Sequence, residues 1–431
     1  MSWHDAGTFL AAYARARRVD RLTSTSRLEA LQSRWLQQFL RQVTAESPFY
    51  RGLRQVPFGE WPVMTKSSWM AQFDTINTLG APLAEVSRIA LEAERTRDFR
   101  ASWRGITVGL STGTSGSRGI FLVSGRERAQ WAGTLLAKLL RGGLASRERV
   151  AFVFRAGGPL YDTVGALRVT FRFFDQSRRW TDLCEEVRVF APTVLVAPAR
   201  TLRLLGETES RLRPKRVISV AEVLDDLDRA ALERRFGVPI EQIYQATEGL
   251  LGISCEHGTI HLNEPFLLVE REWQDAAHSR FVPIVTDLWR RSQPVIRYRL
   301  NDVLRLRATP CPCGRAATAL EAVDGRLDDV LWLRGTNGTD VPVFPDLLTR
   351  LIVRTVAPLE DFELAEHERG AWVIRLRPTV AGADARHLVD ECTRLARSLG
   401  AEPPSIELEE MALVPASGKQ RRVRGAPTCV S

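Results

Sequence analysis

The sequence contains little lysine. Only 4 of its 60 basic residues are lysines, at positions 66, 138, 215 and 419, and the arginines are spread along the chain rather than clustered. A nucleic-acid-binding surface normally gathers basic residues on one face or in one segment. The net charge of +9 therefore indicates an arginine-rich composition, and we expect no nucleic-acid partner. Because lysine is rare, the position of each lysine carries more information than usual.

Cysteine and long hydrophobic runs are scarce as well. Six cysteines in 431 residues are too few and too unevenly spaced for a disulfide scaffold, so we expect reduced thiols. No run reaches the roughly 18 apolar residues that a membrane helix needs. The N-terminal stretch MSWHDAGTFLAAYARARR is amphipathic and lacks the apolar block of a signal peptide. We expect a cytoplasmic protein with no membrane partner.

The order of hydrophobic patterns predicts an α/β fold. Residues 1–104 show mostly helical spacing, with two helices before Ser47-Pro48, and residues 105–250 alternate strand and helix patterns around VAFVF, PTVLVAP and RVISV. Such alternation is typical of a largely parallel sheet. Residues 251–327 are strand-rich and predict a β subdomain. The pattern in residues 328–431 indicates a small α+β domain, so we expect a large domain over 1–327 and a small one after it.

Two polar segments interrupt this pattern. The first, STGTSG, supplies hydroxyls and glycines that could surround a phosphate, or it is a surface turn; it is not a Walker loop, because no GK[ST] follows. Its residues are Ser111, Thr112, Gly113, Thr114, Ser115 and Gly116. The second, YQATEG (244–249), places an aromatic ring, a hydroxyl and a carboxylate after an apolar run, or it is a strand end with a solvated Glu248. Neither segment decides between these alternatives alone.

Cysteine and histidine gather between residues 255 and 313. CEHGTIH and CPCGR could supply thiolates and imidazoles from two hairpins to a tetrahedral zinc site. The spacing is not a common zinc-finger pattern, so two tight turns with free thiols remain the alternative. The candidate ligands are Cys255, His261, Cys311 and Cys313, with His257 as a substitute.

Taken in order, the motifs from about residue 105 to the C-terminus resemble those of the adenylate-forming ligase superfamily. The resemblance is to its phenylacetate–CoA ligase-like branch, and to a clade related to the deazaflavin-coenzyme adenylyl synthetases. STGTSG is similar to the SSGTTG phosphate loop, SVAE (219–222) to the adenine segment and YQATEG to YGxTE. QPVIRYRLND (293–302) resembles PxxRYRTGD, and VDGRLDD (323–329) resembles the GRxDD hinge. Five ordered matches are far more specific than any one of them.

The resemblance implies roles for individual residues. The phosphate loop (Ser111 to Gly116), Ala221, Glu222, Tyr244, Asp302 and Arg326 would bind ATP or AMP, Thr247 would contact the α-phosphate, and Glu248 would hold Mg²⁺. Asp328 would be the hinge about which a mobile C-terminal domain turns. Relatives carry a similar Cys, His and Cys-x-Cys set, which favours structural zinc. Ser115 replaces the second threonine of the loop, and Ser117-Arg118 stand where many relatives have Lys-Pro. Both departures keep hydroxyls and backbone amides.

The acid pocket is the least defined part of the resemblance. The stretch 152–175 would line it, with Phe154, Arg155, Gly157, Gly158 and Tyr161 as candidates, although such aromatics are usually core residues. The resemblance implies an AMP-forming ligase that adenylates a small, aromatic carboxylic acid and transfers the acyl group to CoA or an acyl carrier protein. The alternatives are adenylation of nitrite for diazotisation of an aryl amine, an amide-forming or cofactor-adenylylating ligase and, from another class, a nucleic-acid-binding protein.

Lys419 is the candidate catalytic cation. Attack of a carboxylate on the α-phosphorus of ATP brings two anions together, so positive charge is needed where negative charge accumulates. The superfamily supplies it from a lysine near the C-terminus, and SGKQRRV contains Lys419, the only lysine after Lys215. A solvated charged tail is the alternative.

Replacing Lys419 by Ala should abolish adenylation while ATP binding stays nearly intact, because the lysine would act on the transition state. ATP–pyrophosphate exchange measures the first property and equilibrium nucleotide binding the second. If adenylation survives in the variant, the assignment of Lys419 is wrong.

Overall fold

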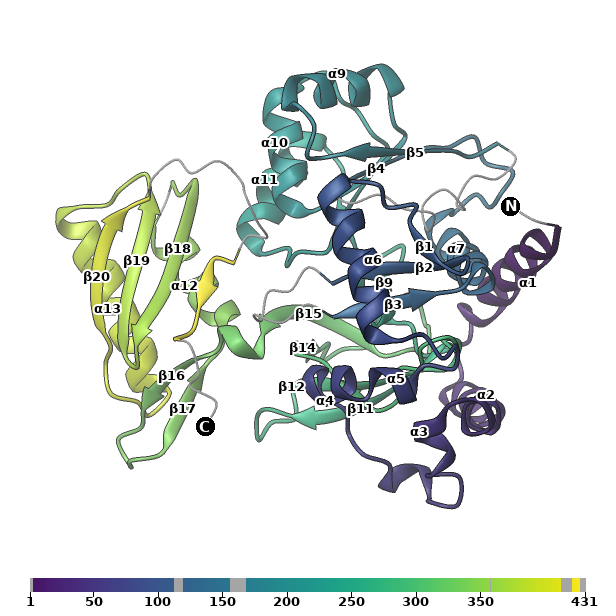
Figure 1. Ribbon diagram of the computed structural model, residues 1–431. Helices are drawn as coiled ribbons and strands as arrows, with labels where there is room; N and C mark the ends of the chain where they lie inside the picture. The colour runs from purple at the N-terminus through teal and green to yellow at the C-terminus, as the bar shows by residue number, and fades with distance from the viewer. Residues whose placement is uncertain (1–2, 112–118, 156–167, 357, 412–420, 427–431) are drawn as a thin grey trace. The chain divides into compact units, whose positions relative to one another are not determined.

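The computed structural model describes residues 3–111, 119–155, 168–356, 358–411 and 421–426 (Figure 1). The chain divides into two compact units. The first comprises residues 1–221, 231–300 and 306–322, and the second comprises residues 222–230, 301–305 and 323–431. The sequence places the boundary after residue 327, whereas the second unit begins at Val323 and takes in two earlier segments. No helix among the described residues is long and apolar enough to span a membrane.

The N-terminal part of the first unit is helical. It contains α1 (Trp3–Val19), α2 (Thr25–Glu46), α3 (Pro48–Arg51), the 3-10 helix η1 (Phe58–Glu60), α4 (Lys66–Ala71), α5 (Phe73–Ile76) and α6 (Leu83–Thr96). Ser24 begins α2 because its hydroxyl accepts a hydrogen bond from the Arg27 backbone N–H at 3.3 Å. The same helix ends before Ser47, and Pro48 starts α3 at a position where proline is favoured.

A large sheet forms the centre of the first unit. Its strands include β4 (Arg149–Phe154), β5 (Thr170–Asp175), β6 (Val194–Ala197), β7 (Arg216–Val220), β8 (Ile240–Ala246), β9 (Gly249–Ser254), β10 (Ile260–Leu262), β11 (Leu267–Trp273), β12 (Arg280–Asp287), β13 (Tyr298–Arg299), β14 (Asp302–Leu306) and β15 (Ala319–Arg326). The boundary between the units falls inside β14 and β15. Strands β5-β4-β6-β7-β8 are parallel neighbours, and β9 then pairs antiparallel with β8 and with β10.

Helices cover the parallel strands, which explains why the inner strands β6 and β7 are almost entirely apolar. The helices are α7 (Gly125–Leu139), α9 (Trp180–Phe190), α10 (Ala199–Thr208) and α11 (Asp226–Phe236). Helix α9 packs on β4 and β5, α10 packs on β6 and β7, and α7 packs on α1 and β9 (Figure 1). All four residues of β6 are buried, as expected for a parallel strand with both faces covered. The mixed α/β fold expected from the sequence is confirmed, although the expected β subdomain continues the central sheet.

A small antiparallel sheet holds the ends of the Ser/Thr/Gly loop. It consists of β1 (Ser102–Trp103), β2 (Ile106–Leu110) and β3 (Ile120–Val123), with α6 packed on it. Strands β2 and β3 pair up to the last residue before the loop. Gly109 is required inside β2, because a Cβ there would lie 2.1 Å from the ring of Phe121. The hairpin therefore fixes where Ser111 lies.

The C-terminal part of the chain forms a second α+β layer. It contains the 3-10 helix η2 (Leu327–Asp329), β16 (Leu331–Arg334), β17 (Asp340–Val343), α12 (Pro345–Thr355), β18 (Asp361–Glu368), β19 (Ala371–Arg377), α13 (Gly382–Ser398), β20 (Ser405–Glu410) and β21 (Val423–Arg424). The strand order is β20-β19-β18-β21. Trp372, Ile374 and Leu388 are among the residues buried between this sheet and its helices.

Arg422 is the most heavily bonded cation of the second unit. Its side chain is only 5% exposed and donates to Asp228 at 2.7 Å, to Asp361 at 2.9 Å and to Asp225. These carboxylates hold the pKa of Arg422 well above its usual range, against the effect of burial. The cluster joins β21 to the first turn of α11 and to β18, so it stabilises a strand only two residues long.

Replacing Arg422 by Met should destabilise the second unit by about 3–5 kcal/mol, because it leaves buried carboxylates unpaired. The matched control is Arg369→Met. The ion pair of Arg369 with Asp340 is about half exposed on both sides, so its loss should cost about 1 kcal/mol or less. Differential scanning calorimetry at neutral pH measures both variants. Equal shifts of the unfolding temperature would contradict the role given to the cluster.

Candidate functional site

A small pocket opens in the first unit. Its walls come from the α4 region, the ends of β2 and β3, the turn after β8, and the segment between β12 and β13. The lining residues are Lys66, Trp69, Met70, Ser111, Gly119, Ile120, Thr247, Glu248, Arg290, Val295 and Tyr298. Segments separated by more than 200 residues in the sequence therefore contribute to one cavity.

Strand geometry places the three sequence-predicted residues of this pocket. Ser111 follows β2, where its N–H donates to the Gly119 carbonyl at 2.8 Å and its hydroxyl accepts from the Gly119 N–H at 2.7 Å. Thr247 and Glu248 form the two-residue connection between β8 and β9. This is the carboxyl end of the parallel strands, the edge at which open α/β sheets usually bind ligands.

Glu248 interacts with a buried tyrosine. Tyr298 is 4% exposed, and its hydroxyl hydrogen-bonds the Glu248 carboxylate; burial and that carboxylate raise the pKa of Tyr298 well above its ordinary value. The hydroxyl thus stays protonated at physiological pH and donates to Glu248. The indole of Trp69 meets the Tyr298 ring edge-on at 5.8 Å, which helps to fix the orientation of the phenol.

Asp287 lies behind the pocket, at the end of β12. Burial raises the pKa of its carboxyl to about 6, although backbone N–H groups of Trp289 and Arg290 and the charge of Arg290 act in the opposite direction. The Trp289 N–H donates to Asp287 at 2.9 Å. A Cβ on Gly249 would lie 3.1 Å from the same carboxylate, so a larger residue directly after Glu248 would require that carboxylate to move by a few tenths of an ångström.

Two polar side chains, one buried and one partly buried, hold the walls together. The amide of Gln293, 0% exposed, accepts from Leu122 N–H at 2.8 Å and donates to the Ile120 carbonyl at 3.0 Å. Glu127, in the first turn of α7, accepts from the N–H groups of Arg291 and Ser292 at 2.7 and 2.8 Å. The first contact joins Gln293 to the hairpin that carries the Ser/Thr/Gly loop, and the second joins residues 291 and 292 to α7, which follows that hairpin.

Sequence reasoning did not select Lys66, Arg290 or Tyr298 for this site. Lys66 starts α4, where Thr65 forms a capping box with Ser68, and its Cε would lie 3.4 Å from a Cβ on Gly119. The rarity of lysine was the available signal for Lys66. Tyr298 lies within the QPVIRYRLND motif (293–302), which resembles PxxRYRTGD. No sequence motif contains Arg290, which is one of many arginines.

The other proposed nucleotide residues lie in several places. Thr112, Gly113, Thr114, Ser115 and Gly116 lie outside the described residues, as does Lys419. Ala221 follows β7 with a φ of +67°, and Tyr244 lies in β8, partly buried against an apolar cluster.

The second unit holds another group of the proposed residues. Glu222 belongs to that unit. So do Asp302 and Arg326, whose side chains approach to 3.9 Å, and Asp328, which accepts a hydrogen bond from Asn301.

The proposed acid-pocket residues are described only in part. Phe154 ends β4 and packs, partly buried, against the main core cluster. The carbonyl of Arg155 accepts a hydrogen bond from Arg97. Gly157, Gly158 and Tyr161 lie outside the described residues.

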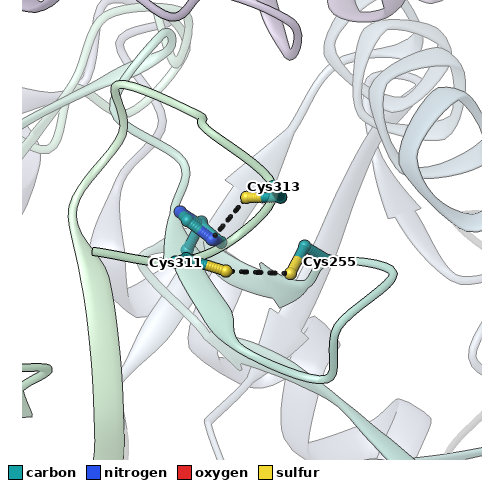
Figure 2. Close-up of side chains that lie close together, drawn as sticks. Cys255, Cys311 and Cys313 are labelled. Carbon is teal, nitrogen blue, oxygen red and sulfur yellow. Dashed lines mark hydrogen bonds between the residues drawn. The ribbon is translucent and has the colours of Figure 1, made fainter. Parts of the chain in front are cut away.

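The proposed zinc ligands lie close together in the first unit. One ligand atom from each of Cys255, His261, Cys311 and Cys313 lies within 4.8 Å of all the others. The sulfurs of Cys255 and Cys311 are 3.6 Å apart, and the Cys313 sulfur is 3.2 Å from His261 Nε2. Figure 2 shows the sulfurs of Cys255 and Cys311 pointing toward each other. His257 is not among the atoms that gather here.

This geometry fits a tetrahedral metal site. Zinc–ligand bonds of about 2.0–2.3 Å imply distances of roughly 3.3–3.8 Å between the ligand atoms of a tetrahedral site. The distance between the sulfurs of Cys255 and Cys311 falls in this range, and the distance from the Cys313 sulfur to His261 Nε2 is slightly shorter. His261 Nδ1 lies 2.9 Å from the Ala317 carbonyl. A proton on Nδ1 leaves Nε2 available as a metal ligand, the usual arrangement of metal-binding histidines.

Comparison with known proteins agrees with this architecture, although no protein-family model matches the chain. A phenylacetate–coenzyme A ligase of Escherichia coli K12 is 24% identical over 389 residues, covering 80% of this chain and 81% of that enzyme. A phenylacetate–coenzyme A ligase of Aromatoleum evansii is 26% identical over 275 residues, 57% of this chain and 59% of its own length.

A solved structure shares the fold of the chain. The crystal structure of 2-hydroxyisobutyryl-CoA ligase, in the postadenylation state with R3-HIB-AMP, superposes with a TM-score of 0.70 at 16% identity and covers 94% of this chain and 91% of its own. The chain thus shares the fold of this ligase. In sequence it is phenylacetate–CoA ligase-like, which supports an adenylate-forming, AMP-forming ligase. The closer relation to deazaflavin-coenzyme adenylyl synthetases stays a prediction.

Proposed function

We propose that this protein uses ATP to convert a small aromatic carboxylic acid into its acyl-adenylate and then transfers the acyl group to the thiol of CoA. The observation that supports it most is one pocket that brings Ser111 of the STGTSG motif together with Thr247 and Glu248 of the YQATEG motif. The two sequence relatives are named for the ligation of phenylacetate to coenzyme A, which favours the same reaction class.

The chemistry of the pocket suits two anionic substrates. The Glu248 carboxylate is an oxygen ligand of the kind that Mg²⁺ prefers, and Mg²⁺ held there would neutralise charge on the phosphates of ATP. Thr247 would donate its hydroxyl to the α-phosphate, and Ser111 would begin the loop that surrounds the other phosphates. Lys66 and Arg290, both in the pocket wall, would supply fixed positive charge.

The remaining nucleotide contacts are proposals based on the motifs. Tyr244 would stack on adenine beside Ala221 and Glu222, and Asp302 and Arg326 would bind the ribose and neighbouring oxygens. Asp328 would act as the hinge. Lys419 would be the cation that acts in the adenylation step.

An aromatic acid is favoured over an aliphatic one for two reasons. The sequence relatives carry phenylacetate in their names. In addition, Phe152 is 3% exposed and packs against Phe154 and Phe171 at centroid distances of 5.5 and 4.6 Å, so Phe154 extends an aromatic cluster to the carboxyl end of β4. Arg155, Gly157, Gly158 and Tyr161 would complete the acid pocket.

The alternative acceptors and substrates gain no support from the relatives described above, none of which is named for nitrite, an aryl amine or a carrier protein. ATP–pyrophosphate exchange tests these alternatives as well, because each of them also begins with adenylation.

ATP–pyrophosphate exchange should be stimulated by arylacetic, benzoic or cinnamic acids, and Glu248→Gln should lower that exchange on the order of a hundredfold or more, because the metal ligand is lost. The matched control is Glu207→Gln, whose carboxylate is 64% exposed on α10 and should leave exchange unchanged. Exchange that depends only on nitrite would refute acid activation and favour the diazotisation alternative. CoA-dependent thioester formation then tests the acceptor.

We also propose that Cys255, His261, Cys311 and Cys313 bind a structural zinc ion. The purified protein should contain stoichiometric zinc by plasma mass spectrometry, and Cys313→Ala should remove it and lower the unfolding temperature, because metal binding contributes directly to folding. Cys184→Ala is the control: this cysteine is more deeply buried, at 4% exposure, but lies outside the cluster. Zinc retained in Cys313→Ala, or equal destabilisation by both substitutions, contradicts the site.

A further inference from the structure

Arg290 is a nearly buried cation in the wall of the pocket. Its residue is 9% exposed and lies in the segment that follows β12. One terminal nitrogen donates to the Thr247 carbonyl at 2.5 Å, and the other donates to the Gln293 amide oxygen at 3.2 Å. The third nitrogen, Nε, is buried and has no hydrogen-bond partner among the described residues.

The hydrogen bonds of Arg290 go to neutral oxygens. Its two terminal nitrogens donate to the carbonyl of Thr247 and to the side-chain amide of Gln293, not to a carboxylate. Among the described residues, the charge of Asp287 acts on the guanidinium. Buried charges in proteins are normally paired. A guanidinium in a pocket wall that donates to neutral oxygens, and whose buried Nε has no hydrogen-bond partner among the described residues, therefore indicates an anionic ligand.

The neighbours of Arg290 suit a phosphoryl group. The same walls contain Ser111, Thr247 and a second cation, Lys66. Guanidinium bonds to phosphate oxygens are charge-assisted and roughly twice as strong as neutral hydrogen bonds. Arg290 is also held from two sides, by Thr247 and Gln293, so it loses little conformational freedom when an anion arrives.

We propose that Arg290 is a further catalytic residue of adenylation and that its guanidinium binds the α-phosphoryl oxygens of the nucleotide. This inference rests on the proposed function. In the step it assists, a carboxylate oxygen of the acid bonds to the α-phosphorus while the bond from that phosphorus to the bridging oxygen breaks. The electron pair leaves with pyrophosphate, and no proton is transferred. Negative charge on the α-phosphoryl oxygens is met by a cation that is already in place.

The test compares Arg290→Gln, which can still donate to the Thr247 carbonyl but carries no charge, with Arg290→Lys, which keeps the charge but loses the planar fork. Calorimetric titration with AMP should show binding weakened about tenfold to a hundredfold in Arg290→Gln. Arg290→Lys should retain most of the affinity. Exchange should fall further than AMP affinity in Arg290→Gln, because the transition state carries more charge.

The matched control is Arg291→Gln. Arg291 is the next residue and does not line the pocket, so this variant should bind AMP like the unmodified protein. Unchanged AMP affinity in Arg290→Gln, with or without reduced exchange, overturns the proposal, because the residue would then only position the Thr247–Glu248 turn. Equal losses in the Gln and Lys variants overturn it as well. Failure of acid activation itself would appear separately, as absent exchange in the unmodified protein.

Discussion

The pocket depends on the buried amide of Gln293. This side chain bonds both strands of the hairpin that carries the Ser/Thr/Gly loop, through Ile120 and Leu122, and it also accepts from Arg290. A fully buried amide without these partners would cost about 1–3 kcal/mol for each unmade bond. The segment after β12 and the loop hairpin are more than 160 residues apart in the sequence. They stay aligned because moving one against the other would break these hydrogen bonds of Gln293. Glu127 reinforces the same junction from α7.

Electrostatics explains why the site draws on so many separate segments. Phosphates and a carboxylate must approach one another in a partly dehydrated cavity, where unit charges interact far more strongly than in water. Cations on one short segment would repel each other and would have to be held together. Lys66 and Arg290 instead come from segments far apart in the sequence of the first unit. Lys66 is held at the start of α4 by the capping box of that helix. Arg290 is held by hydrogen bonds to the Thr247 carbonyl and the Gln293 amide oxygen.

The sequence was sufficient for part of this site and not for the rest. Ser111, Thr247 and Glu248 could be chosen because each belongs to a contiguous motif, and the order of the motifs is visible along the chain. Arg290 could not be chosen, because its significance comes from its bond to the carbonyl of Thr247, 43 residues away, and from its place in the pocket wall. The alternating strands around VAFVF and RVISV were predicted correctly, since covered parallel strands are apolar throughout.

Strand β18 and the packing of α11 were not evident from the sequence, because both depend on contacts between distant residues or on buried charged side chains. Strand β18 reads DFELAEHE, and its charged residues conceal the alternation that buries Phe362, Leu364 and Glu366. Glu366 is tolerated inside because it accepts hydrogen bonds from the Gly370 N–H and the Trp372 indole. The sequence could not show that the first turn of α11 packs with the C-terminal residues, because Arg422 and Asp228 are 194 positions apart.

Strand β9 connects the two chemically distinctive parts of the first unit. Glu248 precedes it and Cys255 follows it, so the pocket and the cysteine cluster are separated by one six-residue strand, about 20 Å of extended chain. The strand pairs with β8 on one side and β10 on the other, and His261 lies on β10. A slip of one residue in β9 would move Glu248 relative to the pocket and point each side chain of the strand to the opposite face. A metal bound by residues on β10 and just after β9 would oppose that slip.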